Sequence, residues 1–180
     1  GTGIGGSPVA SLMENLIEVL CQESDEYEGL LDLSQKKTQI IASADLEELQ
    51  RITDDEQELV DRLNRLEKKR VEVTKDIANV LNRDVEKMKL SKLIEMLAER
   101  PKEQARLAHA HDRLRRAVQR LQRANEQNRE LLEEALGMVE FEMNLLQAAK
   151  SAPETANYTR TAYNSGAQMG ANSGNFDAKQ

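Results

Sequence analysis

The chain has 180 residues, a length that ordinarily forms one domain, and 32 % of its residues are charged. It contains no Trp, two Phe and three Tyr, so any core must be aliphatic, which suits packed helices better than a β-sandwich. The single cysteine, Cys21, has no partner for an internal disulfide, as is usual in the cytoplasm. No stretch resembles a signal peptide or a membrane span, and we expect no membrane insertion.

The formal net charge of −7 is already reached at Asp32, because the first basic residue is Lys36. Binding to nucleic acid by the whole surface is therefore disfavoured, and no nucleic acid partner is expected. The arginine-rich stretch over residues 106–123 lacks aromatic side chains for base stacking, so pairing with the acidic first helix explains it better. The arginines expected beside that helix are Arg62, Arg65, Arg116, Arg120 and Arg123.

The first two helices are predicted from their caps and their apolar spacing. Residues 1–10 are rich in glycine and lack an initiator Met, so they read as a flexible leader or a remnant of cloning. A first helix is predicted from Ser11, its N-cap, to about Ile41. After a short link, Asp45 is predicted to cap a second helix that ends near Asn82.

A short helical elbow and one long helix follow. Residues 90–97 are predicted to form the elbow, with Ser91 as its cap. Pro101 suits the first turn of a last helix that continues to about Lys150 and would be about 75 Å long. Its apolar and small residues recur in alternating steps of three and four, the seam of a left-handed coiled coil over roughly five heptads. The seam residues are Leu107, His111, Leu114, Val118, Leu121, Asn125, Asn128, Leu132, Ala135, Val139, Met143 and Leu146.

Asn125 and Asn128 interrupt this seam. Buried seam asparagines usually fix the register; alternatively, this stretch faces solvent or a partner. The seams can be buried only if the long helices fold back on one another. The sequence therefore predicts an all-α fold over residues 11–150: an antiparallel, coiled-coil-like bundle of three long helices with a short helical elbow. The polar segment 151–180 cannot bury enough surface to offset its ordering entropy and is predicted to be a flexible tail.

The residue pattern favours no catalytic, cofactor or metal site. His109 and His111 lie two residues apart on different helix faces, whereas helical metal pairs are three or four apart, so His111 is expected to be a packed or interfacial seam residue. Cys21 lies among acidic residues, which disfavour its thiolate. The glycines of the leader follow no strand, so they form no phosphate loop. We predict a protein that binds along a helical surface, not an enzyme.

Two groups of candidate interaction residues lie toward the C-terminus. Apolar side chains at the end of the long helix cover more than one of its faces, so packing leaves some of them exposed. These candidate partner-binding residues are Met138, Val139, Phe141, Met143, Leu145 and Leu146. In the tail, Tyr158 and Tyr163 are candidate docking residues, because an exposed tyrosine often anchors an interface; alternatively, they fold back onto the bundle.

The order and spacing of six short stretches carry a family resemblance. They are residues 12–20, 45–53, 56–63, 90–94, 125–128 and 151–158. Through them, the run from about Ala10 to Tyr158 resembles the FlgN-type flagellar export chaperones, particularly those of Gram-positive bacteria.

The resemblance implies a cytoplasmic chaperone of the flagellar type III export system. Its clients would be hook–filament junction proteins, held near their C-terminal helices and handed to the export gate or export ATPase. The apolar residues at the end of the long helix then become candidate client-binding residues, and Tyr158 and Tyr163 candidate docking residues for the export gate. The alternative is a structural coiled-coil oligomer without an export role, and homodimer formation stays open.

Overall fold

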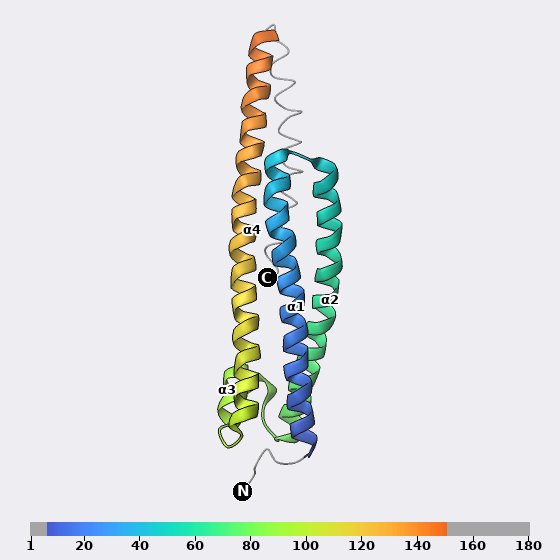
Figure 1. Cartoon of the computed structure of the whole chain (residues 1–180), viewed down its shortest axis with the longest axis vertical. Helices are drawn as coiled ribbons and strands as arrows, with labels where there is room; N and C mark the ends of the chain where they lie inside the picture. Colours follow the sequence, from blue (N-terminus) through green and yellow to red (C-terminus); the bar gives the residue numbers. More distant parts are fainter. Residues whose placement is uncertain (1–6, 151–180) are drawn as a thin grey trace. The chain divides into compact units, whose positions relative to one another are not determined.

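A computed structural model describes residues 7–150, and within them the chain is helical without a strand (Figure 1). The expected all-α class is confirmed. The elements in chain order are α1 (Ser7–Ser43), α2 (Leu46–Val80), the 3₁₀ helix η1 (Val85–Lys87), α3 (Leu90–Met96) and α4 (Pro101–Lys150). The first six residues of the expected leader and the whole expected tail, 151–180, lie outside the described residues.

Helix α1 begins earlier than its sequence predicts. It starts at Ser7 rather than at Ser11, so the predicted cap is wrong. Proline is tolerated in a first helical turn, and Pro8 occupies that turn. Val9 is buried beside Met13, so extending the helix covers an apolar side chain that the sequence alone placed in the leader. Tertiary packing therefore decides this boundary.

The turn from α1 to α2 follows the prediction more closely. The carboxylate of Asp45 accepts a hydrogen bond from the backbone N–H of Glu48 at 3.1 Å, which confirms its predicted N-cap role. Ala44 has a φ of 56° and Asn82 a φ of 53°, each just past the end of a helix. The left-handed conformation at these positions ends α1 and α2.

The elbow has a different cap from the one predicted. Helix α3 begins at Leu90 with Lys89 as its N-cap residue, so Ser91 lies inside the first turn and its predicted capping role is wrong. The sequence analysis missed η1, which precedes α3. The carboxylate of Asp84 accepts a hydrogen bond from the backbone N–H of Glu86 at 3.2 Å and caps this 3₁₀ turn. The real polar cap of the connection is therefore Asp84.

The chain divides into two compact units, and each is described by itself. Unit 1 comprises Gly1–Leu33 and Arg51–Leu121, and unit 2 comprises Ser34–Gln50 and Gln122–Gln180. The core of unit 1 is aliphatic and draws on α1, α2, α3 and α4. Its fully buried side chains include Leu16, Leu20, Ile77, Leu93, Leu97 and Leu107. The elbow is thus part of this core, because α3 contributes Leu93 and the residue after the helix is Leu97.

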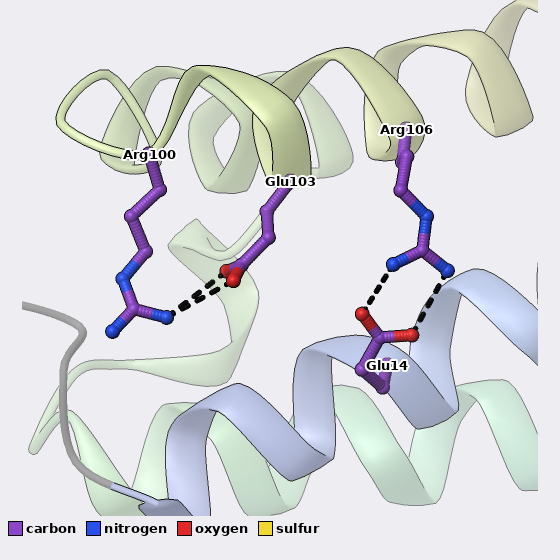
Figure 2. A network of polar contacts seen from close by, with 4 residues as sticks. All are labelled: Glu14, Arg100, Glu103 and Arg106. Atoms are coloured by element: carbon purple, nitrogen blue, oxygen red, sulfur yellow. Dashed lines mark hydrogen bonds and ion pairs between the residues drawn. The ribbon is translucent and has the colours of Figure 1, made fainter.

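Ion pairs in unit 1 give the direction of its helices. Glu26 pairs with Arg62 at 3.0 Å and Glu23 pairs with Arg70 at 2.9 Å, so α1 and α2 run antiparallel in this unit. Between α1 and α4 the residue numbers rise together, from Glu14 with Arg106 to Glu28 with Arg113, which is a parallel pairing. The carboxylate of Glu14 faces the guanidinium of Arg106 with both oxygens, next to the separate pair of Arg100 and Glu103 (Figure 2).

The acidic first helix was expected beside five arginines, and the structure corrects this set. Arg62 pairs as expected, although it is itself exposed, whereas in the described residues no ion pair joins α1 to Arg65, Arg116, Arg120 or Arg123. The other arginines that pair with α1 in unit 1 are Arg70, Arg106 and Arg113. Arg113 is bound by Glu28 and by Asp25, and these two carboxylates raise the pKa of its guanidinium. The sequence alone did not identify which arginines face α1.

The Glu23–Arg70 pair predicts a pH dependence of stability. Burial raises the pKa of Glu23 above its ordinary value of 4.5, and the nearby charge of Arg70 opposes this shift without cancelling it. The folded chain therefore keeps the Glu23 carboxyl protonated at pH values where the unfolded chain has ionised it. The stability that comes from this difference in protonation is lost as the pH rises through the pKa of Glu23 in the folded chain.

Glu23→Gln removes that loss, because an amide cannot ionise. We expect its free energy of unfolding, relative to wild type, to rise as the pH increases from 4.5 through the raised pKa of Glu23. Urea unfolding followed by circular dichroism at several pH values measures this difference. The exposed Glu58→Gln is the matched control. A difference between wild type and Glu23→Gln that is constant with pH would contradict the prediction.

In unit 2, a polar layer settles the open question about the seam asparagines. Asn128 is 3 % exposed, and its amide donates to the backbone carbonyl of Ser34 at 2.7 Å and to the Ser34 hydroxyl at 2.9 Å. The Ser34 hydroxyl donates to Asn125 at 3.2 Å, and the hydroxyl of Thr38 donates to the Asn128 carbonyl oxygen. Asn128 and Ser34 are buried, Asn125 and Thr38 are half-buried, and their hydrogen bonds fix how α4 is aligned on α1 in this unit.

Candidate functional site

The candidate partner-binding residues lie in a part of unit 2 where α1 has already ended. In the polar layer, Thr38 of α1 meets Asn128 of α4, and the two helices run parallel. Helix α1 ends at Ser43, five residues after Thr38. Because α1 and α4 run parallel here, the α4 residue that lies level with Ser43 is Glu133, five residues after Asn128. Beyond this level α4 continues to Lys150, past the turn between α1 and α2 (Figure 1).

We call residues 130–149 of α4 the distal segment. From Leu136 onward its large apolar side chains are exposed, with Met138 at 66 % and Phe141 at 65 % of their full exposure. All six candidate residues are among them: Met138, Val139, Phe141, Met143, Leu145 and Leu146. Single exposed apolar residues are ordinary on a protein surface, but a contiguous group on one helix is typical of an interaction site.

These side chains form two rows. The heptad row continues the seam in steps of four and three through Leu132, Leu136, Val139, Met143 and Leu146. The second row lies on the neighbouring face in steps of three and four through Met138, Phe141 and Leu145. Leu136, which is 43 % exposed, was not among the predicted residues, although its place in the heptad row was a usable signal. The two rows together offer more apolar surface than one coiled-coil seam.

A shallow hollow lies along the second row. It is lined by Glu134, Gly137, Met138, Phe141 and Glu142. Gly137 has no side chain and no neighbour within 4 Å of the place where a Cβ would stand, so the helix backbone is open to an incoming side chain here. The floor of the hollow is apolar and its two glutamates flank it.

The distal segment is strongly acidic. It contains the five glutamates Glu130, Glu133, Glu134, Glu140 and Glu142, and no Lys or Arg. All five are exposed. Glu133 pairs with Arg129, one turn earlier, at 3.4 Å. Within the distal segment, the charged side chains that border the apolar rows are therefore all carboxylates.

A second hollow lies in unit 1, between the C-terminal part of α2 and the elbow. Its lining includes Val71, Val85 and Lys89, together with Arg70, which is already paired with buried Glu23. His111 also lines it, half-buried, with Nδ1 3.6 Å from the Asp112 carboxylate. This hollow has little exposed charge that would select a partner.

Between residues 7 and 150, no three His, Cys, Asp or Glu side chains are grouped to hold a metal ion. Over the same residues, none of the helices has the length and apolarity needed to cross a bilayer. Tyr158 and Tyr163, the candidate docking residues of the tail, lie outside the described residues.

Comparison with known proteins gives one family. The family model described as FlgN protein matches residues 12–166, which is most of the chain. The matched range includes the distal segment of α4 and both tail tyrosines. No curated protein and no solved structure matches the chain.

Proposed function

Because the chain belongs to the FlgN family, we propose that it is a flagellar type III export chaperone for hook–filament junction proteins. The family itself indicates a general role in flagellar export. The proposal adds that the client is bound near its C-terminal helices, in the cytoplasm, and is then delivered to the export gate. The exposed apolar surface of the distal segment is the observation that carries it.

The proposed binding mode is a client helix laid along the two rows of the distal segment. An amphipathic helix places side chains at the same three- and four-residue steps, so it can interdigitate with both rows. We also propose that the three long helices form an antiparallel bundle, to which the client helix is added. The client would then complete the packing that α1 leaves off at Ser43.

The exposed area sets the expected strength of this complex. About half of each of the six side chains is exposed, so covering them contributes on the order of 5–9 kcal/mol. Association and side-chain ordering oppose this with about 4–15 kcal/mol. The balance favours a complex of modest affinity, which suits a chaperone that must release its client.

Isothermal titration with the C-terminal helices of candidate junction proteins tests the proposal, combined with light scattering of the protein alone. We expect saturable binding and a mass that stays small as the concentration rises. The structural-oligomer alternative, favoured by the exposed heptad row, predicts no client binding and a large mass that resists dilution. That pair of results would overturn the chaperone assignment.

The proposal includes a docking role for the tail tyrosines at the export gate. If both are interface anchors, Tyr158→Ala and Tyr163→Ala should each weaken binding to the cytosolic domain of the gate by more than about 1 kcal/mol. The free energy of unfolding should stay unchanged. Loss of stability with unchanged gate binding would mean that the tyrosines pack on the protein itself.

A further inference from the structure

We propose that the partner of the distal segment is a helix of a different protein whose apolar face is bordered by Lys and Arg side chains. This inference rests on the proposed function, because it takes the distal segment as the docking site, and it adds the chemical class of the partner. It concerns the second row, Met138, Phe141 and Leu145, and the two glutamates of the hollow.

The position of the two glutamates gives the first argument. Glu134 and Glu142 lie four residues before and four residues after Met138, so they stand one helical turn away on the same face. Both line the hollow together with Met138 and Phe141. A helix seated on the second row would pass beside both carboxylates, so its flanking residues are best matched if they are cationic.

The balance of charge gives the second argument. Each of the five glutamates of the distal segment is exposed, and the segment offers no cation of its own. Glu133 has Arg129 as a neighbour, but Arg129 lies before the segment, more than two helical turns before the second row begins at Met138. An acidic partner helix would therefore meet like charges along the whole row, and a neutral one would leave the carboxylates unmatched.

The same charges argue against a second copy of this segment as the occupant. If two distal segments paired, in either direction and in any register, every charged side chain within the pairing would be a glutamate. Coiled-coil flank charges set partner choice in this way. The acidic border therefore selects a different helix rather than its own counterpart.

Two synthetic helical peptides test the inference against the full chain. They share one apolar heptad face, and one carries Lys while the other carries Glu at the flanking positions. Binding is measured by fluorescence anisotropy at about 0.1 M salt, where the Debye length is about 10 Å, and at about 1 M, where it is about 3 Å. We expect the Lys peptide to bind about tenfold more tightly at the lower salt, and the difference to shrink at the higher salt.

Charge-reversed variants give the matched comparison. Glu134→Lys with Glu142→Lys should reverse the preference between the two peptides. Glu58→Lys with Glu72→Lys changes the net charge of the chain equally, at exposed positions on α2 outside the hollow, and should leave the preference unchanged. Equal effects of the two double variants would mean that only net charge matters, and would overturn the inference.

Further outcomes separate this inference from the proposed function. If a junction-protein helix binds and Met138→Ala with Phe141→Ala weakens it, while the peptides bind equally or not at all, the docking site stands and the charge inference fails. If that client helix does not bind, the proposed function fails. A dimer of the protein alone that Glu134→Lys with Glu142→Lys dissociates would make a second copy the occupant. A gain of about tenfold in peptide affinity on ending the chain at Lys150 would make the tail the occupant.

Discussion

Ending the chain after Leu136 is expected to abolish client binding while most of the helical signal remains. The truncation removes the second row and all of the heptad row beyond Leu136, so only Leu132 and Leu136 are left of the apolar surface of the distal segment. The core of unit 1 lies wholly before this point, so its packing is kept. Isothermal titration gives the affinity and circular dichroism gives the helical content.

The same truncation also removes the tail, so a second variant isolates the surface itself. In the full chain, Met138→Ala, Phe141→Ala and Leu145→Ala together keep good helix formers in α4 and remove the second row. Fully burying such a side chain contributes about 1.5–3 kcal/mol, and each is more than half exposed before binding, so the triple variant should lose on the order of 3–5 kcal/mol. Unchanged client affinity in both variants would place the binding site elsewhere.

Leu93→Ala is expected to lower the free energy of unfolding by about 2–5 kcal/mol. Leu93 is fully buried although α3 has only seven residues, so the substitution leaves a cavity in the core of unit 1. Urea unfolding followed by circular dichroism measures the change. A loss below about 1 kcal/mol would mean that the elbow is a surface connection and not a part of the core.

Ser91→Ala is the matched control, two residues away in the same helix. A capping serine replaced by alanine costs about 0.5–2 kcal/mol, whereas a serine inside the first turn has no such role. Ser91 is exposed and the N-cap residue of α3 is Lys89, so we expect a change within about 0.5 kcal/mol. The contrast with Leu93→Ala separates a packing role of the elbow from its capping.

Helix starts that depend only on neighbouring residues were predicted correctly. Pro101 begins α4, and Asp45 caps α2 through its own side chain, because first-turn chemistry depends only on neighbouring residues. Helix starts that also depend on packing or on another capping residue were predicted wrongly. Ser11 is overridden by the burial of Val9, and Ser91 follows a connection that Asp84 caps.

The candidate site was predictable to a similar degree. The spacing of the apolar residues from Met138 to Leu146 already implied that some must be exposed, because they cover more than one helix face. Where the exposure begins could not be read from spacing, since it depends on where α1 ends beside α4. Nor could composition show that Asn128 is buried and hydrogen-bonded to Ser34.

The polar layer of unit 2 also determines how much apolar surface the distal segment leaves exposed. Two seams of leucines pack equally well when one helix is shifted by a heptad along the other. A shift of α4 by seven residues along α1 would instead move Asn128 from Ser34 to the buried Ile41, whose side chain cannot form a hydrogen bond. Such an unsatisfied amide costs about 1–3 kcal/mol. The shift would also cover or uncover two positions of the heptad row. The length of the proposed client site is therefore encoded by a few hydroxyl and amide groups, at a distance from the residues proposed to touch the client.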